Sequence, residues 1–503
     1  MPEKEKKRRP AAPGKKASHK KSRSARYSAN RPEIIATCCF FGLLFAALIG
    51  YLSYFTATSE EEMINNSYNS RQEILLSRNY RGTIYSRDGD VLAETRLNEG
   101  VGEEDSQEET RIYPYGKLFA HAVGYSTKGR TGVEALANYY LINTSTSLAN
   151  KAANDLAGIK NPGDSVYTTL DVDLQQVADD QLNIYKGAIV VTEVATGKIL
   201  AMVSHPGFDP NEIGAIWDSI VEDEDSSVLL NRVTQGQYPP GSTFKIVTAL
   251  EYIRENPDTY DDYSYQCNGY FSSGTGRINC YHGTNHGQVG FESSFAKSCN
   301  SSFANIGVNL EQQSFEETLE ELLFNRPLPV DFPYSESKAN VVDRVSMNEL
   351  MQTSIGQGRT QISPLHLNMI TSAIANGGIL MKPYAVDRVE NDEGRIVKVF
   401  EPSAYGSLMT GEEAGILKGL MESVVEEGTG RKLSGLSYTA AGKTGSAEYN
   451  DDKEDSHAWF TGFAPVENPE ICVTIIVEGA GSGGDYAVPI AKRIFDAYFN
   501  DGR

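Results

Sequence analysis

The chain has 503 residues, 40% of them hydrophobic, which is enough for two or three domains with a sizeable core. Its formal net charge of -21 is unevenly distributed, because residues 1–31 contain twelve Lys/Arg and only two Glu. The acidic remainder argues against nucleic acid as a substrate, since phosphate backbones attract basic surfaces.

An uncharged apolar segment runs from Ile34 to Thr56. As a helix it would be about 34 Å long, enough to cross a bilayer core of about 30 Å. A buried core helix and a cleaved signal peptide are the alternatives, but the run exceeds the usual apolar region of a signal peptide and no A-x-A pattern follows it. We expect an uncleaved transmembrane anchor, with the basic tail (residues 1–33) in the cytoplasm and residues 57–503 outside.

Residues 57–160 are expected to form a short N-terminal module. Glu60 to about Leu97 predicts a charged helix that leads into a short strand region. An acidic, glycine-containing loop (NEGVGEEDSQEET) separates this region from a second block, Arg111–Glu134.

Residues 161–503 alternate between strand-like and helix-like runs. Gly187–Val194 and Gly197–Val203 are rich in β-formers and predict a hairpin. The run TFKIVTALEYI has apolar residues at helical spacing. Three strands and an amphipathic helix are predicted near the end of the chain: YTAAGKTGSAE, HAWFTGFAPV, ICVTIIVE and AVPIAKRIFDAYF. This order predicts an α+β fold in which a mixed sheet is covered by helices.

The six cysteines do not make a disulfide scaffold. Cys267 and Cys280 bracket a loop and could pair in an oxidising exterior, and two free thiols are an equal alternative. Cys299 and Cys472 have no evident partner in the sequence. The histidines include no HExxH pair, and His286, in an Asn-His-Gly turn, is expected to be structural.

A candidate nucleophile, Ser242, follows Tyr-Pro-Pro-Gly and precedes Lys245 by three residues. The prolines and glycine end any preceding element, so Ser242 is predicted at the start of a helix, with Lys245 on the same face. A lysine that is desolvated or beside another cation can be neutral enough to activate a serine. Backbone N–H groups at the helix start would face the developing negative charge. Alone this signal is weak, because Ser-x-x-Lys also occurs at Ser18, Ser294 and Ser335.

A second candidate motif is Ser298-Cys299-Asn300. Its hydroxyl could relay a proton and its amide could orient a peptide carbonyl. Ser-x-Asn recurs elsewhere in the chain, and the alternative is a polar turn.

The third candidate motif, Lys443-Thr444-Gly445-Ser446, lies on a predicted strand, and Lys-Thr-Gly occurs once in the chain. A cation and two hydroxyls on a strand edge would hold a carboxylate, and Gly445 would let an extended substrate lie close to the backbone. An exposed lysine followed by a turn is the alternative.

Together the three motifs resemble the Ser-x-x-Lys, Ser-x-Asn and Lys-Thr-Gly set of penicillin-recognising serine enzymes. The surrounding segments are similar to penicillin-binding protein transpeptidase domains: NRVTQGQYPPGSTFKIVTA, SIGQGRTQISPL, VVEEGTG and HAWFTGFAP. RGTIYSRDGDVLA, RIYPYG and GVE resemble the N-terminal modules of the class B, monofunctional branch. Only Thr95–Thr110 separates the first two of these blocks, which indicates a short form without a large head insertion. The resemblance covers about Arg81 to Phe499.

The resemblance implies the penicillin-binding serine-transpeptidase fold, with a mainly antiparallel sheet, a small N-terminal module and one transmembrane helix. It implies a peptidoglycan D,D-transpeptidase that cross-links stem peptides ending in D-Ala-D-Ala through a Ser242 acyl-enzyme and is acylated by β-lactams. Lys245 would be the general base and Ser298 would pass a proton toward the leaving amine. The substrate would be bound by five residues: Asn300, Lys443, Thr444, Gly445 and Ser446. Backbone N–H groups of Ser242 and Ser446 would form the oxyanion hole, and no metal or organic cofactor is needed.

The resemblance also implies a bacterial cell-membrane location, as a single-pass protein with its catalytic domain outside the cytoplasm. Glu134 could suggest a wall-polymerising glycosyltransferase, but about 100 residues between anchor and transpeptidase domain are too few for that domain. A polytopic membrane glycosyltransferase is therefore an expected partner.

The alternatives are a D,D-carboxypeptidase or β-lactamase, and a β-lactam sensor or non-catalytic cell-wall scaffold. No Glu-x-x-Leu-Asn motif follows the second motif, which disfavours a class A β-lactamase. A sensor should carry several spans, and a scaffold could have lost its nucleophile, whereas all three motifs are intact here.

Overall fold

The computed structural model describes six stretches of the chain: residues 31–65, 71–98, 108–223, 226–342, 345–448 and 456–500. The basic tail up to residue 30 and the acidic loop from residue 99 to 107 therefore lie outside the described residues. The chain divides into two compact units, Met1–Asn69 and Ser70–Arg503.

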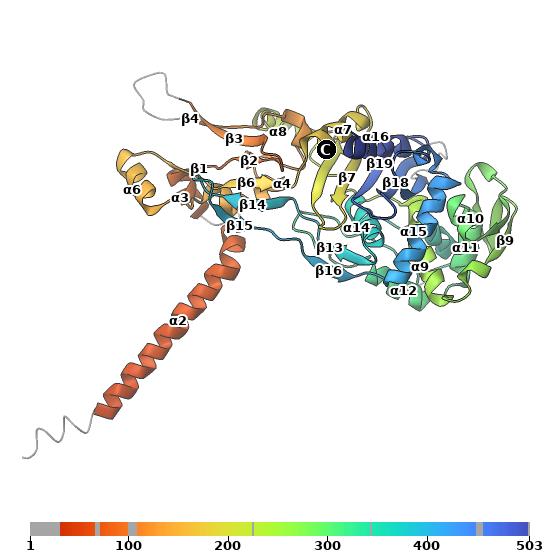
Figure 1. Ribbon diagram of the computed structural model, residues 1–503, viewed down its shortest axis with the longest axis horizontal. Helices are drawn as coiled ribbons and strands as arrows, with labels where there is room; N and C mark the ends of the chain where they lie inside the picture. The colour runs from red at the N-terminus through yellow and green to blue at the C-terminus, as the bar shows by residue number, and fades with distance from the viewer. Residues whose placement is uncertain are drawn as a thin grey trace, which may run out of the picture. The chain divides into compact units, whose positions relative to one another are not determined.

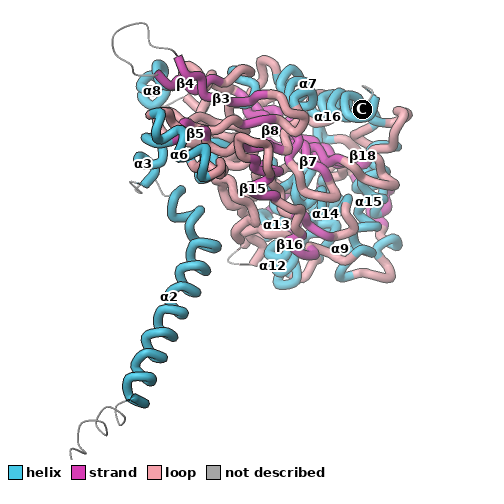
Figure 2. Tube along the Cα trace, turned by 60° about the vertical axis from the view of Figure 1, so that its left-hand side comes forward, coloured by secondary structure: helices cyan, strands magenta, loops and turns pink. Residues whose placement is uncertain are grey.

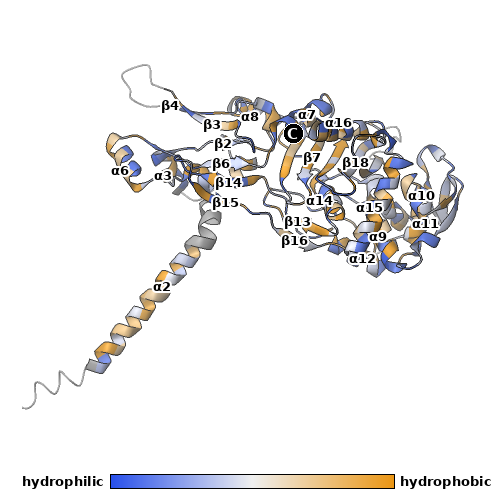
Figure 3. Cartoon of the chain, viewed as in Figure 1, coloured by the Kyte–Doolittle hydropathy of each residue, from blue (hydrophilic) through white to orange (hydrophobic). Residues whose placement is uncertain are grey.

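The described part of the first unit is one long helix, α2 (Arg31–Asn65), drawn in red in Figure 1. Its segment Pro32–Phe55 has a mean hydropathy of 2.3 and none of it is buried. Apolar residues recur along the helix, as the orange segments of Figure 3 show. The apolar helix predicted from Ile34 to Thr56 is thus confirmed, and it is long enough to cross a bilayer.

A five-stranded antiparallel sheet forms the centre of the second unit, in the order β17-β18-β19-β7-β8. Its strands are β17 (Ala441–Glu448), β18 (Ser456–Ala464), β19 (Ile471–Val477), β7 (Gly187–Glu193) and β8 (Ile199–His205). The predicted hairpin and the three predicted C-terminal strands are confirmed. β17, which carries the third motif, is an edge strand.

Helices cover both faces of this sheet. On one face α7 (Val172–Leu182) and α16 (Ala487–Asn500) lie side by side, as Figures 1 and 2 show. On the other face α14 (Pro364–Ala375) packs against β7, β18 and β19. Because side chains on both faces are buried, these strands are continuous apolar runs rather than alternating ones, and β7 is largely orange in Figure 3.

The remaining helices of this half pack on β17, on α14 or on one another. They are the one-turn 3-10 helix η2 (Gly241–Phe244), α9 (Lys245–Glu255), α10 (Phe291–Ala296), α11 (Asn300–Asn309), α12 (Gln312–Glu321), α13 (Met347–Ser354) and α15 (Gly411–Glu426). Short antiparallel pairs join β9 (Ser264–Cys267) to β12 (Gly287–Gly290), β10 (Tyr270–Ser273) to β11 (Gly276–Asn279), and β13 (Ile379–Met381) to β16 (Ala404–Ser407). Two of these pairs, β9/β12 and β10/β11, lie between α9 and α11 in the sequence.

A second sheet of six strands has the order β15-β14-β6-β2-β3-β4. Four strands come from the N-terminal part, β2 (Ile84–Tyr85), β3 (Val91–Asn98), β4 (Glu108–Ile112) and β6 (Ser165–Thr168), and two come from far along the chain, β14 (Val386–Glu390) and β15 (Ile396–Val399). β2 and β6 are parallel, whereas the other pairs are antiparallel. Around this sheet lie α3 (Arg71–Arg78), α4 (Gly132–Leu136), α5 (Asn138–Ile142), α6 (Leu148–Ala157), α8 (Ile213–Glu222) and the parallel pair β1 (Asn79–Tyr80) and β5 (Asn161–Pro162).

A buried carboxylate ties the blocks of the N-terminal part together. Glu134 on α4 is fully buried and accepts hydrogen bonds from Arg81 Nε at 2.5 Å and from Arg111 Nε at 2.8 Å. Burial alone would raise the pKa of Glu134, but Arg111 and Arg81 bring that pKa below its usual range. Glu134 therefore joins segments that the sequence showed as separate blocks, and its role is structural.

We expect Glu134→Ala to destabilise the second unit by about 3–5 kcal/mol, because it leaves two buried guanidinium groups unpaired. The measurement is the midpoint of thermal unfolding of the purified chain. Glu320→Ala is the control, since the Glu320–Arg326 pair is exposed and is worth about 0–1 kcal/mol. Equal midpoints for the two variants would contradict the structural role of Glu134.

Candidate active site

The turn that carries Ser242 is fixed from two sides. Trp459 Nε1 on β18 donates a hydrogen bond to the Pro239 carbonyl at 3.0 Å. The backbone N–H of Gly241 donates to the carbonyl of Gly356 at 2.8 Å. Gly241 has φ of +55°, a conformation that favours glycine. The turn enters η2, so Ser242 lies at the start of the helical segment that continues as α9, as the sequence predicted.

Lys245 is the first residue of α9, and its side chain is fully buried. Its Nζ donates hydrogen bonds to the Ser298 carbonyl at 2.7 Å, to Ser298 Oγ at 3.2 Å and to Asn300 Oδ1 at 2.7 Å. Within the described residues no hydrogen bond joins Lys245 to the Ser242 hydroxyl. Lys245 therefore connects the helix that follows Ser242 to the second motif.

Ser298 lies in the turn between α10 and α11 and has φ of +56°, which is uncommon for a residue with a side chain. Its hydroxyl also accepts a hydrogen bond from Lys443 Nζ at 3.0 Å. Two lysines from distant parts of the sequence thus meet at one serine hydroxyl. Asn300, which begins α11, donates from Nδ2 to the Asn279 carbonyl at 3.1 Å, and this fixes its side-chain amide.

Both lysines are fully buried, and within the described chain neither forms an ion pair with a carboxylate. Burial lowers the pKa of Lys245 to about 8, although the thiols of Cys299 and Cys280 act in the opposite direction. Burial and the charge of Lys245 together lower the pKa of Lys443 well below its usual range. A substantial fraction of neutral lysine is therefore present at mildly alkaline pH, which a general base requires.

The third motif lies on β17 and faces the turn that carries Ser242. A Cβ on Gly445 would lie 2.9 Å from the Pro240 carbonyl oxygen, so a larger residue would push the strand away from that turn. Thr444 Oγ1 is hydrogen-bonded to Thr429 Oγ1 at 2.5 Å. The hydroxyl of Ser446 accepts a hydrogen bond from the Gly483 N–H at 3.3 Å.

These residues surround one cavity of about 240 Å³. Six of the eight predicted site residues line it: Ser242, Ser298, Asn300, Thr444, Gly445 and Ser446. The other two, Lys245 and Lys443, are buried and reach the cavity residues through Ser298 and Asn300. The structure therefore brings all three motifs to one place.

Three contributors to this arrangement were not identified from the sequence: Gly356, Thr429 and Trp459. Each lies in a segment that resembles the family, SIGQGRTQISPL, VVEEGTG or HAWFTGFAP, yet their contacts are made across the fold. A single sequence does not show which residue of such a segment is the contacting one.

The structure places three of the cysteines close together, including Cys299, for which the sequence showed no partner. Cys267 and Cys280 are free thiols with Sγ atoms 3.7 Å apart, which is the second of the two alternatives left open by the sequence. Cys299, for which no partner was evident, has its Sγ 3.8 Å from Cys280 Sγ. His286 Nδ1 lies 3.5 Å from Cys267 Sγ. Four potential ligands thus gather beside the second motif.

Two family models match the chain. The Penicillin binding protein transpeptidase domain matches residues 187–496, and the Penicillin binding protein A dimerisation domain matches residues 81–166. The peptidoglycan D,D-transpeptidase PbpA of Mycolicibacterium smegmatis is 28% identical over 418 residues, which cover 78% of this chain and 84% of the relative. The peptidoglycan D,D-transpeptidase MrdA of Acinetobacter baumannii is 30% identical over 442 residues, covering 77% of this chain and 66% of the relative.

The fold is similar to that of penicillin-binding protein A from M. tuberculosis, solved as a penicillin G acyl-enzyme complex. The TM-score is 0.74 at 27% identity, covering 84% of this chain and 100% of that chain. The predicted α+β fold is confirmed. The transpeptidase domain match covers more than half of this chain. The chain therefore belongs to the class B penicillin-binding protein transpeptidases.

Proposed function

We propose that this chain is a peptidoglycan D,D-transpeptidase that cross-links stem peptides through an acyl-enzyme on Ser242. The observation that carries the proposal is the hydroxyl of Ser298, which accepts hydrogen bonds from both Lys245 and Lys443 beside the Ser242 cavity. The names of the relatives and the acyl-enzyme structure of the mycobacterial protein support the same reaction class.

In the acylation step, Ser242 Oγ attacks the carbonyl carbon of the penultimate D-Ala, and neutral Lys245 takes the hydroxyl proton. The bond to the terminal D-Ala nitrogen then breaks. The leaving amine receives its proton through Ser298, which the two lysines hold in position. A β-lactam acylates Ser242 in the same way, but its leaving amine remains attached to the ring-opened drug.

In the second step, an amino group of a neighbouring stem peptide attacks the Ser242 ester. A new amide bond forms, and Ser242 regains a proton. Water in place of the amine would give a carboxypeptidase, so the acceptor decides the outcome.

Substrate binding is assigned to the surroundings of Ser242. Asn300 orients the donor peptide, while the hydroxyls of Thr444 and Ser446 bind its terminal carboxylate with positive potential from Lys443. Gly445 lets the peptide lie along β17, which is an edge strand of the sheet. The backbone N–H groups of Ser242 and Ser446 stabilise the oxyanion, at about 2.7–4 kcal/mol per donor.

The test is incubation of the purified full chain with a stem peptide ending in D-Ala-D-Ala and an acceptor peptide carrying a free side-chain amine. We expect mass spectrometry to detect a cross-linked dimer together with released D-Ala. Release of D-Ala without dimer would favour the carboxypeptidase, and no product from folded protein would favour the scaffold. Either of these results would overturn the transpeptidase proposal.

We also propose that α2 is a single-pass anchor of the bacterial cell membrane, with residues 1–33 cytoplasmic and a catalytic domain of residues 161–503 outside. The Lys/Arg excess before the apolar segment supports this orientation. Residues 57–160 would be a short non-catalytic module. Because that module is too small for polymerisation, a polytopic membrane glycosyltransferase is the proposed partner.

A further inference from the structure

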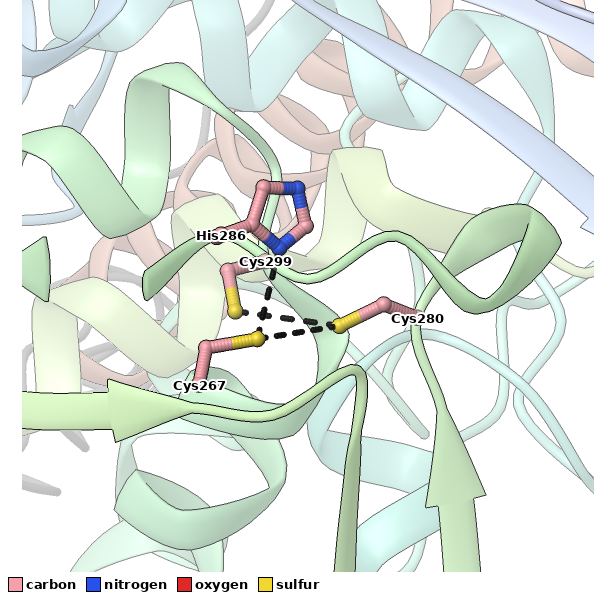
Figure 4. A group of neighbouring side chains, drawn as sticks. All are labelled: Cys267, Cys280, His286 and Cys299. Carbon is pink, nitrogen blue, oxygen red and sulfur yellow. Dashed lines mark hydrogen bonds between the residues drawn. The ribbon is translucent and has the colours of Figure 1, made fainter. Parts of the chain in front are cut away.

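Three cysteines and one histidine gather beside the second motif, and we call Cys267, Cys280, His286 and Cys299 the thiol–imidazole cluster (Figure 4). Cys267 ends β9, Cys280 follows β11, His286 precedes β12, and Cys299 caps the start of α11. Their potential ligand atoms all lie within 4.8 Å of one another. Four side chains from separate turns therefore point to one spot.

Three of the six ligand-atom distances in the cluster match those of a tetrahedral metal site, and all six are at most 4.8 Å. With zinc–sulfur bonds of about 2.3 Å and a zinc–nitrogen bond of about 2.0–2.1 Å, sulfur atoms lie about 3.8 Å apart, and sulfur and nitrogen about 3.6 Å apart. The observed separations are 3.7 Å for Cys267–Cys280, 3.8 Å for Cys280–Cys299 and 3.5 Å from Cys267 Sγ to His286 Nδ1. A disulfide would require sulfur atoms about 2.05 Å apart.

The surroundings stabilise negative charge on the sulfur atoms. Each sulfur accepts a backbone N–H: Cys267 from Gly269 at 3.4 Å, Cys280 from Ser301 at 3.5 Å, and Cys299 from Ser302 at 3.5 Å. The Ser301 hydroxyl also lies 3.0 Å from Cys267 Sγ and from Cys280 Sγ. Hydrogen bonds of this kind orient thiolate ligands and tune their basicity.

The burial and the chemistry of the four potential ligands favour a zinc ion. The three cysteines are at most 2% exposed, so unpaired thiolates would be costly there. Three thiolates and one imidazole in a closed tetrahedron form a structural zinc set, because no position is left for a reacting water.

We propose that the thiol–imidazole cluster binds one Zn²⁺ ion, which holds the turn that carries Ser298 and Asn300 in its active conformation. Cys299 lies between these two residues, so a metal bond to its sulfur fixes both neighbours. His286 also lines the Ser242 cavity. The ion touches no reacting atom, and Cys299 is a positioning residue rather than a catalytic one.

The ion would stabilise the unfavourable backbone conformation of Ser298. A serine at φ +56° persists only where its surroundings enforce that conformation. Lys245 and Lys443 fix its side chain by hydrogen bonds to the hydroxyl. The metal-bound Cys299, which is the next residue, would fix its backbone. Without the ion, the β9–β12 region would be linked to α11 by weaker contacts.

The first measurement is the metal content of the full chain, determined by elemental mass spectrometry after purification without chelator. We expect one zinc per chain, reduced by more than about tenfold in Cys267→Ser and Cys280→Ser, since even the loss of groups that only orient ligands costs 10–100-fold in affinity. The matched control is Cys472→Ser, because Cys472 is equally buried but lies outside the cluster, against Asn368. Equal zinc loss in the control, or a reduced wild-type chain without zinc, would overturn the proposal.

A second measurement does not depend on the folding of variants. The wild-type chain is stripped with a chelator and titrated with Co²⁺, and we expect thiolate-to-cobalt charge-transfer absorption that saturates at one equivalent. A Cys267–Cys280 disulfide found in the freshly purified chain would instead replace the metal site. The metal content is independent of the proposed transpeptidase function, so the two proposals can fail separately.

The positioning role has its own readout. Zinc removal should slow fluorescent-penicillin acylation of the wild-type chain by about tenfold or more, and added Zn²⁺ should restore it. If the stripped chain is acylated at an unchanged rate, the ion does not hold the Ser298 turn.

Discussion

Ser242→Ala is expected to abolish covalent labelling of the full chain by a fluorescent penicillin. The variant lacks the only oxygen of the Ser242 side chain, so no ester can form at the cavity. Turnover of a D-Ala-D-Ala peptide should fall by a factor on the order of 10⁶, as found for loss of a serine nucleophile in other hydrolases. The measurement is in-gel fluorescence of wild type and variant at equal protein concentration.

The chain provides its own control for this experiment. Ser335 also begins a Ser-x-x-Lys sequence, but its hydroxyl donates to the Gln235 carbonyl at 2.9 Å, away from the cavity. Ser335→Ala should therefore label like the wild type. Persistent labelling of Ser242→Ala would identify another nucleophile, and the assignment of the site would have to be abandoned.

Lys245→Ala is expected to slow acylation by about 10²–10⁴-fold, the usual contribution of a general base. The substitution also removes the hydrogen-bond donor that Ser298 and Asn300 share. Part of the expected loss in rate therefore comes from a less well-positioned second motif. The rate is measured by stopped-flow or quenched labelling. Thermal unfolding of the variant shows whether the fold is retained, and an unchanged rate in a folded variant would exclude Lys245 as the base.

The pH dependence distinguishes a base from a structural cation. Because the pKa of Lys245 is lowered to about 8 by burial, the neutral fraction rises as pH increases through that value. Acylation of the wild type should therefore increase up to about pH 8 and then level off. The groups that face this amine are Lys443 and the Cys299 and Cys280 thiols. Lys245→Ala should lose this rise, whereas a purely structural lysine would leave the profile flat in both proteins.

The five-stranded sheet was predictable because its strands have local signals in the sequence. β7, β8 and β19 are long apolar runs buried on both faces, and β17 was marked by its Lys-Thr-Gly sequence. The candidate site residues could be chosen from the sequence for a different reason: each motif is short and contiguous, so it can be recognised without knowing the fold. The meeting of Lys245 and Lys443 at Ser298 required the structure.

The second sheet was only partly predictable. β2 and β6 have two and four residues, and β15 (Ile396–Val399) is exposed along its whole length, so neither length nor apolar pattern marks them. The thiol–imidazole cluster was missed because its four ligands are spread from Cys267 to Cys299 without the close cysteine pairs typical of zinc sites.

The origin of the second sheet has a consequence for how the chain matures. β6 pairs with β2 on one side and with β14 on the other, yet β14 is synthesised more than two hundred residues later. In the proposed topology the residues after α2 cross the membrane in chain order, so β6 would present an open strand edge until residues 386–399 follow. Such edges pair readily with other chains, and pairing across so long a separation is slow. In that topology, the period between the translocation of β6 and that of β14 is when the new chain would most need protection from aggregation.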